Sequence, residues 1–245
     1  MIIIVDREAR NKSVLSSIIE NYIKTQSAVS SDDICESFDC SSATIRNIMC
    51  ELEEQGYLTH LHTSGGRVPT DKGYRCYVDM LLSQMKLLKE EKERITKEYN
   101  HQLDKLEDVL EKTSEVLSAF THCAGIVSYL SQDNKIYYNG ASFIIEHPEL
   151  KHIEKIRSIL RLLEEKKTLL EIINRGLEKR FNVYIGQELA CREIAGCSLV
   201  VSTYDIENKP CGRIAVLGPR SMDYVRVIPT IGYVSELVGK ALENL

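Results

Sequence analysis

The order of elements between residues 30 and 69 constrains the fold most. A serine pair at 30–31 can cap a short helix that carries Ile34, a tight turn falls at 39–40, and serines at 41–42 can cap a longer helix. The longer helix ends near Gly56. A short helix, a turn of a few residues and a second capped helix make a helix-turn-helix.

The longer helix has two distinct faces. Its apolar residues Ile45, Ile48, Met49 and Leu52 share one side, which we expect to pack on a first helix from about Arg7 to Lys24. The opposite side carries small or hydrogen-bonding groups: Ser42, Ala43, Arg46, Asn47 and Cys50. Close approach to a DNA major groove needs small residues, and Arg or Asn to read base edges. The alternative is an ordinary surface helix.

A hairpin follows this helix and predicts the wing of a winged helix. Residues 57–62 alternate like a strand, and Gly65-Gly66 supplies the positive φ angles of a tight turn. Arg67-Val68 returns and Pro69 ends the strand. We expect the wing and the start of the next helix to contact DNA phosphates. The candidate DNA-binding residues are therefore Ser42, Ala43, Arg46, Asn47, His60, His62, Thr63, Ser64, Arg67, Lys72 and Arg75.

The charge balance restricts how such a domain can bind DNA. The chain has a net charge of -5, and its first eighty residues carry eight basic and twelve acidic side chains. A generic polyanion binder would show a basic excess. Between residues 60 and 75 only Asp71 opposes the basic groups, so the positive charge is expected to be concentrated at the wing, with specificity coming from base contacts.

The middle of the chain predicts a long helix. Thr70 or Asp71 can cap it, and no strong breaker follows before about Phe120. Apolar residues spaced by three and four give a coiled-coil-like seam that could join two copies. The alternative, weighed equally, is a helix packed on its own chain. The tentative dimerisation residues are Leu88, Ile95, Tyr99, Leu103, Leu106, Leu110 and Leu117.

The C-terminal half alternates strands and helices and predicts an α+β fold. Two helices are expected within 149–178, separated near Lys166. The final helix starts after Pro219 and Ser221. The expected strands are 125–130, 136–145, 182–185, 197–206 and 212–217. The expected divisions are 1–72 for the winged helix, 73–120 for a helical linker, and 121–245 for the α/β domain with a helical segment at 147–181.

Catalytic and metal-binding patterns are missing from the sequence. It has no P-loop, no G-x-G-x-x-G, no G-x-S-x-G and no H-E-x-x-H, so we expect no enzyme activity, cofactor or metal. Its eight cysteines form no C-x-x-C pair and are expected to be free buried thiols. Without a membrane-length apolar run or a signal-like start, the protein is expected to be cytoplasmic.

Several segments resemble the HrcA heat-shock repressors. Residues 62–75 read HTSGGRVPTDKGYR, and the preceding segments ATIRN at 43–47 and LEEQGYL at 52–58 are also similar. Looser similarity covers 185–188, 197–201 and 212–219.

The resemblance implies a homodimeric repressor with a winged helix and a GAF-like domain. It implies binding to the inverted repeat called CIRCE upstream of chaperone operons, with the chaperonin GroEL supporting the active form. The DNA-contact positions that it implies are Ser42, Arg46, Asn47, His62, Thr63, Ser64 and Arg67. Many members are longer and carry a dimerising insertion in the GAF-like domain, for which only residues 147–181 could serve here.

Other functions stay open from the sequence. The GAF-like domain could sense a small molecule, because apolar strands serve a core and a pocket equally. A coiled-coil assembly protein with a vestigial winged helix would show no sequence-specific DNA binding. A direct temperature-sensing role is a further alternative.

Overall fold

The computed structural model describes residues 7–60, 66–82, 87–99, 105–130, 135–176, 178–243 and 245. The chain forms two compact units, Met1–Ser83 and Gln84–Leu245. This division differs from the expected one, because the expected linker at 73–120 is not a separate element. Its first part belongs to the first unit and its remainder to the second.

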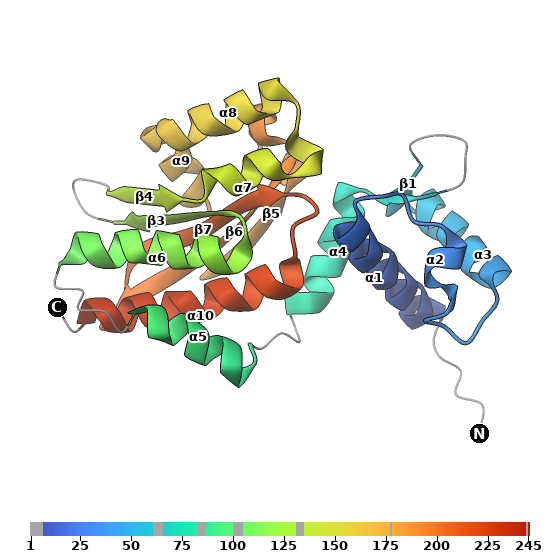
Figure 1. Ribbon diagram of the computed structural model, residues 1–245, viewed down its shortest axis with the longest axis horizontal. Helices are drawn as coiled ribbons and strands as arrows, with labels where there is room; N and C mark the ends of the chain where they lie inside the picture. Colours follow the sequence, from blue (N-terminus) through green and yellow to red (C-terminus); the bar gives the residue numbers. More distant parts are fainter. Residues whose placement is uncertain are drawn as a thin grey trace. The chain divides into compact units, whose positions relative to one another are not determined.

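The first unit has the expected winged-helix elements (Figure 1). Two short strands pair antiparallel, with Leu58 opposite Pro69 and Thr59 opposite Val68, and Arg67 forms a further bridge to Val29. The helices and strands are α1 (Arg7–Thr25), α2 (Ser31–Cys35), α3 (Ser42–Glu54), β1 (Leu58–Thr59), β2 (Val68–Pro69) and α4 (Asp71–Leu82).

Buried apolar side chains and a close backbone approach hold this unit together. All four residues of the predicted α3 stripe are buried, and α3 and α4 both pack on α1. Thr70 Oγ1 accepts a hydrogen bond from the Gly73 amide at 3.1 Å, which caps α4. A Cβ at Gly73 would lie 2.3 Å from the Tyr57 carbonyl oxygen. Glycine is therefore required where α4 meets the start of the wing.

The second unit is built on a five-stranded antiparallel sheet in the order β4-β3-β7-β6-β5. The long hairpin of β6 and β7 turns at Glu207 and Asn208, both with positive φ. The strands are β3 (Ala124–Tyr129), β4 (Ile136–Asn139), β5 (Phe181–Ile185), β6 (Cys197–Ile206) and β7 (Lys209–Pro219). The expected strand at 136–145 is wrong in its second half, because Gly140 at φ +81° ends the strand and begins α7.

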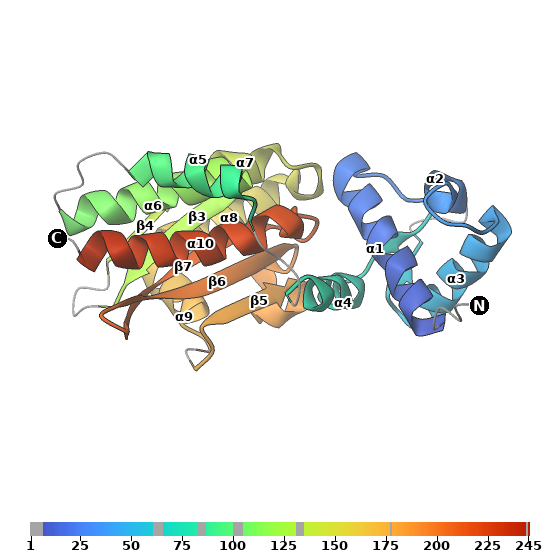
Figure 2. The ribbon, with the colours of Figure 1, turned by 90° about the horizontal axis from the view of Figure 1, so that it is seen from below.

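Helices cover both faces of this sheet (Figures 1 and 2). On one face lie α6 (Leu106–Thr121) and α10 (Tyr224–Glu243), with α5 (Lys89–Tyr99) packed on both. The other face carries α7 (Ala141–Glu146), α8 (Ile153–Glu164) and α9 (Lys166–Ile173), with short 3-10 turns at Pro148–Leu150, Gly186–Leu189 and Arg192–Ile194. The α+β prediction is confirmed, and α8 and α9 separate near Lys166 as expected.

A buried arginine ties the sheet to the end of α9. The Arg213 side chain is fully buried, and its guanidinium donates to the carbonyl oxygens of Ile173 at 2.8 Å and Lys179 at 3.0 Å. It also reaches the carbonyls of Arg175 and Gly176, each at 3.3 Å. Burial lowers the pKa of Arg213. The carbonyls at the end of a helix carry partial negative charge, so these contacts stabilise the cation without a carboxylate.

The predicted continuous helix from 70 to about 120 is wrong. Leu87 and Leu88 are not helical, and Lys105 has extended backbone angles of -136° and 149°. Of the tentative dimerisation residues, Ile95, Leu110 and Leu117 are fully buried within the second unit. These three pack on their own chain and have no surface left for another copy. Leu88 is 68% exposed, Leu106 is half-buried, and Leu103 lies outside the described residues.

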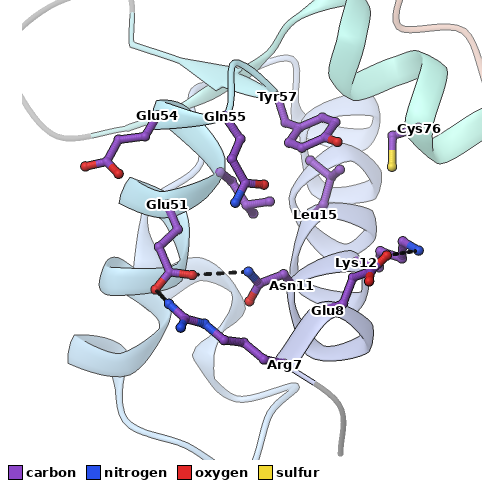
Figure 3. A pocket seen from close by; sticks show the side chains of 11 residues that line it. Arg7, Glu8, Asn11, Lys12, Leu15, Glu51, Glu54, Gln55, Tyr57 and Cys76 are labelled. Atoms are coloured by element: carbon purple, nitrogen blue, oxygen red, sulfur yellow. Dashed lines mark hydrogen bonds and ion pairs between the residues drawn. The ribbon is translucent and has the colours of Figure 1, made fainter.

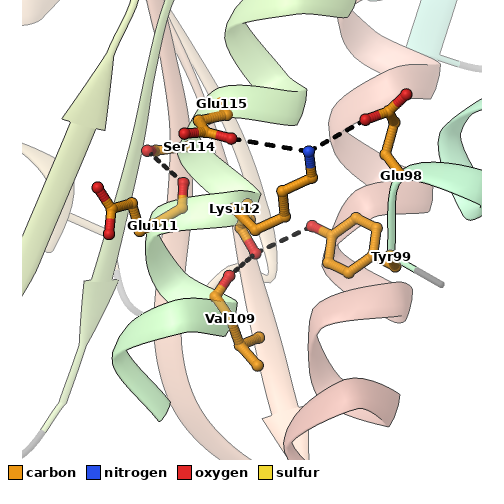
Figure 4. Close-up of polar contacts among 8 residues, drawn as sticks. Glu98, Tyr99, Val109, Glu111, Lys112, Ser114 and Glu115 are labelled. Carbon is orange, nitrogen blue, oxygen red and sulfur yellow. Dashed lines mark hydrogen bonds and ion pairs between the residues drawn. The ribbon is translucent and has the colours of Figure 1, made fainter. Parts of the chain in front are cut away.

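Helix α5 docks mainly through polar contacts (Figure 4). Lys112 of α6 lies 3.0 Å from Glu98 and 3.7 Å from Glu115, and the Tyr99 hydroxyl donates to Thr113 at 2.9 Å. Burial raises the pKa of Tyr99, so its phenol stays protonated as the donor. The Thr96 and Tyr233 hydroxyls lie 2.9 Å apart. Within α5, whose residues are all described, only Ile95 is fully buried.

We predict that α5 opens locally before the sheet unfolds, because little apolar surface holds it. Replacing Ile95 with Ala removes about 2–5 kcal/mol of packing. In Ile95→Ala, hydrogen exchange should accelerate across residues 89–99 and change little in β6 and β7. Equal acceleration in the central strands would contradict this, because it would place α5 in the global unfolding unit.

Among the described residues, no helix combines the length and apolar character that crossing a membrane requires.

Candidate nucleic-acid interface

The exposed face of α3 carries the polar groups that the sequence predicted there. Ala43, Arg46, Asn47 and Cys50 are exposed, on the side opposite the buried stripe. Ser41 caps this helix, because its Oγ accepts a hydrogen bond from the Thr44 amide at 3.2 Å. The side chains of Arg46 and Asn47 make no hydrogen bond or ion pair with another residue in the described part of the chain. Their polar atoms are therefore available to an external partner.

Ser42 does not share this availability. Its hydroxyl donates to Asp32 Oδ1 at 2.5 Å and lies 2.8 Å from the Ser31 hydroxyl. Both partners belong to α2, so Ser42 fastens the two helices of the helix-turn-helix. The structure therefore gives Ser42 an internal role, and its expected DNA contact stays a prediction.

Glu53 of α3 holds two basic side chains of the hairpin. Its carboxylate lies 3.1 Å from the Arg67 guanidinium, and its other oxygen contacts His60 Nδ1. Arg67 also donates to Cys50 Sγ at 3.6 Å. The sequence prediction counted only Asp71 against the basic groups of residues 60–75 and missed Glu53, which precedes that window. His62, Thr63 and Ser64 lie outside the described residues.

The two basic residues after the wing have partners within the protein. Lys72 Nζ donates to the Gln55 carbonyl oxygen at 2.8 Å and lies 4.6 Å from the centre of the Tyr57 ring. Arg75 pairs with Asp79 one helical turn later, at 3.4 Å. Lys72 thus satisfies a carbonyl at the C-terminal end of α3, where a cation also interacts favourably with the helix dipole. The predicted phosphate contact of Lys72 stays a prediction.

A cavity of about 600 Å³ lies between α1, α3 and α4 (Figure 3). Four of its charged groups form two pairs, Arg7 with Glu51 at 2.5 Å and Lys12 with Glu8, and Glu51 also accepts from Asn11 at 3.2 Å. The hydrogen bond from Arg7, followed by that from Asn11, lowers the pKa of Glu51. Burial raises the pKa of Cys76, the thiol in this cavity. These features brace α1 against α3, and they offer no activated nucleophile.

Metal and disulfide chemistry find no support in the described residues. They contain no cluster of three or more His, Cys, Asp or Glu that could hold a metal ion. All eight cysteines are free, but only Cys123 and Cys197 are buried, so the expected burial is wrong for the other six. Burial raises the pKa of Cys123 and of Cys197 to about 12, so both thiols are protonated at neutral pH.

Comparison with known proteins matches both units of the chain. Residues 16–70 match a family model described as a DeoR-like helix-turn-helix domain. Residues 128–228 match the model of the HrcA protein C terminal domain.

Full-length relatives carry the same family name. The "Heat-inducible transcription repressor HrcA" of Carboxydothermus hydrogenoformans is 28% identical, over 97% of this chain and 98% of the relative. The protein of that name from Geobacter sulfurreducens is 29% identical, over 98% and 99%. The chain is thus similar to HrcA proteins over nearly its whole length.

The HrcA relatives are longer than this chain. The alignment with the Carboxydothermus protein runs over 337 positions, 92 more than the 245 residues here, so at least 92 positions of the alignment have no counterpart in this chain. The fold itself is known, since a crystal structure of a protein described as hypothetical covers 96% of this chain and 98% of its own with a TM-score of 0.79. Its sequence identity is 18%, and the likeness concerns the fold alone.

We predict that Lys72 contributes to folding more than to DNA affinity. In Lys72→Ala, the loss of its hydrogen bond to Gln55 should destabilise the first unit by about 1 kcal/mol. Urea unfolding followed by tyrosine fluorescence measures this. Lys24→Ala, which removes an exposed cation near the end of α1, is the matched control and should change stability little. Unchanged stability in Lys72→Ala, with weaker DNA binding, would instead make Lys72 a phosphate contact.

Proposed function

We propose that this chain is an HrcA-type heat-inducible transcription repressor whose first unit binds DNA through the exposed face of α3. The observation that carries the proposal is the combination of a buried stripe on one side of α3 with the unengaged Arg46 and Asn47 on the other. The names of the relatives and the helix-turn-helix match support the same function.

The exposed side chains of α3 favour hydrogen bonds to DNA bases over electrostatic attraction to phosphates. An arginine can donate two hydrogen bonds to the O6 and N7 atoms of guanine, and an asparagine can pair with the N6 and N7 atoms of adenine. Arg46 and Asn47 are adjacent in the first half of α3, the end that a recognition helix directs at base edges. Exposed Ala43 leaves room for close approach. The acidic balance of the first unit keeps the nonspecific electrostatic contribution small.

The operator that we propose is a CIRCE-type inverted repeat bound by a homodimer. A two-fold symmetric site matches a two-fold symmetric protein, with half-sites about one helical turn apart or a multiple of it. Exposed Leu88 and half-buried Leu106 are the tentative seam residues that stay available to a second copy. We further propose that the chaperonin GroEL supports the active form, so that unfolded protein relieves repression by occupying the chaperonin.

A salt titration of binding tests this function. The full chain is titrated onto a duplex with a CIRCE-type inverted repeat and onto a scrambled duplex, with and without GroEL. Tight binding to the repeat, weak binding to the scrambled duplex, and improvement by GroEL are expected. Equal weak binding to both duplexes would contradict DNA-sequence recognition, and selective binding unchanged by GroEL would contradict the chaperonin coupling alone.

We predict that Arg46→Ala weakens binding to the inverted repeat by about 1–3 kcal/mol and relaxes the base preference at one position of each half-site. Competition binding against single-base operator variants measures both effects. Arg10→Ala removes an equal charge from the exposed surface of α1 and should leave the base preference intact. An equal loss on specific and scrambled DNA would make Arg46 a phosphate contact.

A further inference from the structure

Glu53 is near the C-terminal end of the recognition helix α3 and contacts side chains on both sides of the hairpin. His60 immediately follows β1, and Arg67 immediately precedes β2. One carboxylate oxygen of Glu53 contacts His60 Nδ1, and the other lies 3.1 Å from Arg67 Nη2. The side chains of Glu53 and Arg67 are only 23% and 16% exposed. This pair is therefore less screened by solvent than an ion pair at the open surface.

The backbone of Arg67 is fixed independently of Glu53. Its amide donates to the Val29 carbonyl at 2.8 Å, and its carbonyl accepts from the Val29 amide at 2.9 Å. The pairing of β1 with β2 continues this ladder. Loss of the Glu53 charge therefore leaves the backbone of Arg67 in place and affects the side chains of Arg67 and His60.

We propose that Glu53 is a specificity-determining residue, which holds the side chains of His60 and Arg67 against α3 and keeps Arg67 from a DNA phosphate. The inference rests on the proposed function of the first unit in DNA binding. It reverses the role that family resemblance assigns to Arg67, which is a direct DNA contact. Because phosphate contacts carry no sequence information, withholding one makes discrimination depend more on Arg46 and Asn47.

The test compares two neighbouring isosteric substitutions of equal charge change. Glu53→Gln removes the carboxylate that faces the wing. Glu54→Gln is the matched control, because Glu54 is exposed and has no partner among the described residues. Binding to the inverted repeat and to a scrambled duplex is measured over a range of salt concentrations, with thermal unfolding recorded for each variant.

Without the Glu53 carboxylate, the Arg67 guanidinium should add one phosphate contact. In Glu53→Gln, affinity for the scrambled duplex should rise, and the slope of log K against log salt should steepen by about 0.9. The ratio of specific to nonspecific affinity should fall, while Glu54→Gln keeps the wild-type slope and ratio. In an Arg67→Ala background, Glu53→Gln should have no further effect. Equal behaviour of the two glutamine variants, or a steeper slope that persists without Arg67, would overturn the proposal.

A second variant tests the inference without touching Glu53. If Arg67 makes no phosphate contact in the wild-type protein, Arg67→Gln should leave the salt slope unchanged. A slope shallower by about 0.9 would show that Arg67 already contacts a phosphate, and would overturn the inference while leaving the proposed function intact. A wild-type protein that binds both duplexes alike would contradict the proposed function, and the inference with it.

Discussion

Burial of one apolar stripe determines what the rest of the first unit can do. Ile45 and Met49 are completely buried, and Ile48 and Leu52 nearly so. Each such side chain contributes about 1.5–3 kcal/mol relative to exposure, so rotating α3 about its axis would cost several of these contributions. The stripe thereby fixes which residues face outward. Arg46 and Asn47 are presented to solvent because their positions on the helix are opposite the stripe.

Charge pairing around that helix is largely internal. Glu53 engages the hairpin, Lys72 engages the end of α3, and Arg7 pairs with Glu51 across to α1. These contacts hold α3 in a frame of helices and hairpin, and they give the nearby cations partners within the protein. A DNA-binding unit of this kind has weak general attraction for polyanions, so its affinity depends on correct base contacts. An acidic domain can recognise DNA in this way, through base contacts.

The sequence predicted features that repeat along one element. The two faces of α3 follow from helical periodicity, and β6 from a run of strand-forming residues before a turn. Features that depend on residues distant in sequence were missed: the hydroxyl of Ser42 bonds to α2, Glu53 bonds to Arg67, and Arg213 binds carbonyls near the end of α9. The strand expected through residue 145 stopped at Gly140, whose positive φ no periodicity reveals. Ile95 and Leu117 were expected on one seam, but they lie on separate helices and are buried within the second unit, because apolar spacing does not say which surface covers a residue.

The central claim is that the outward face of α3 meets the operator, and the native thiol of Cys50 on that face tests it most directly. The full chain is treated with a maleimide, alone and with saturating inverted-repeat or scrambled duplex, and each cysteine is followed by peptide mass spectrometry. The inverted repeat should slow the modification of Cys50 strongly while leaving Cys211, in the second unit, unchanged. Modification of Cys50 at the same rate with the operator bound would contradict the placement of α3 in the groove.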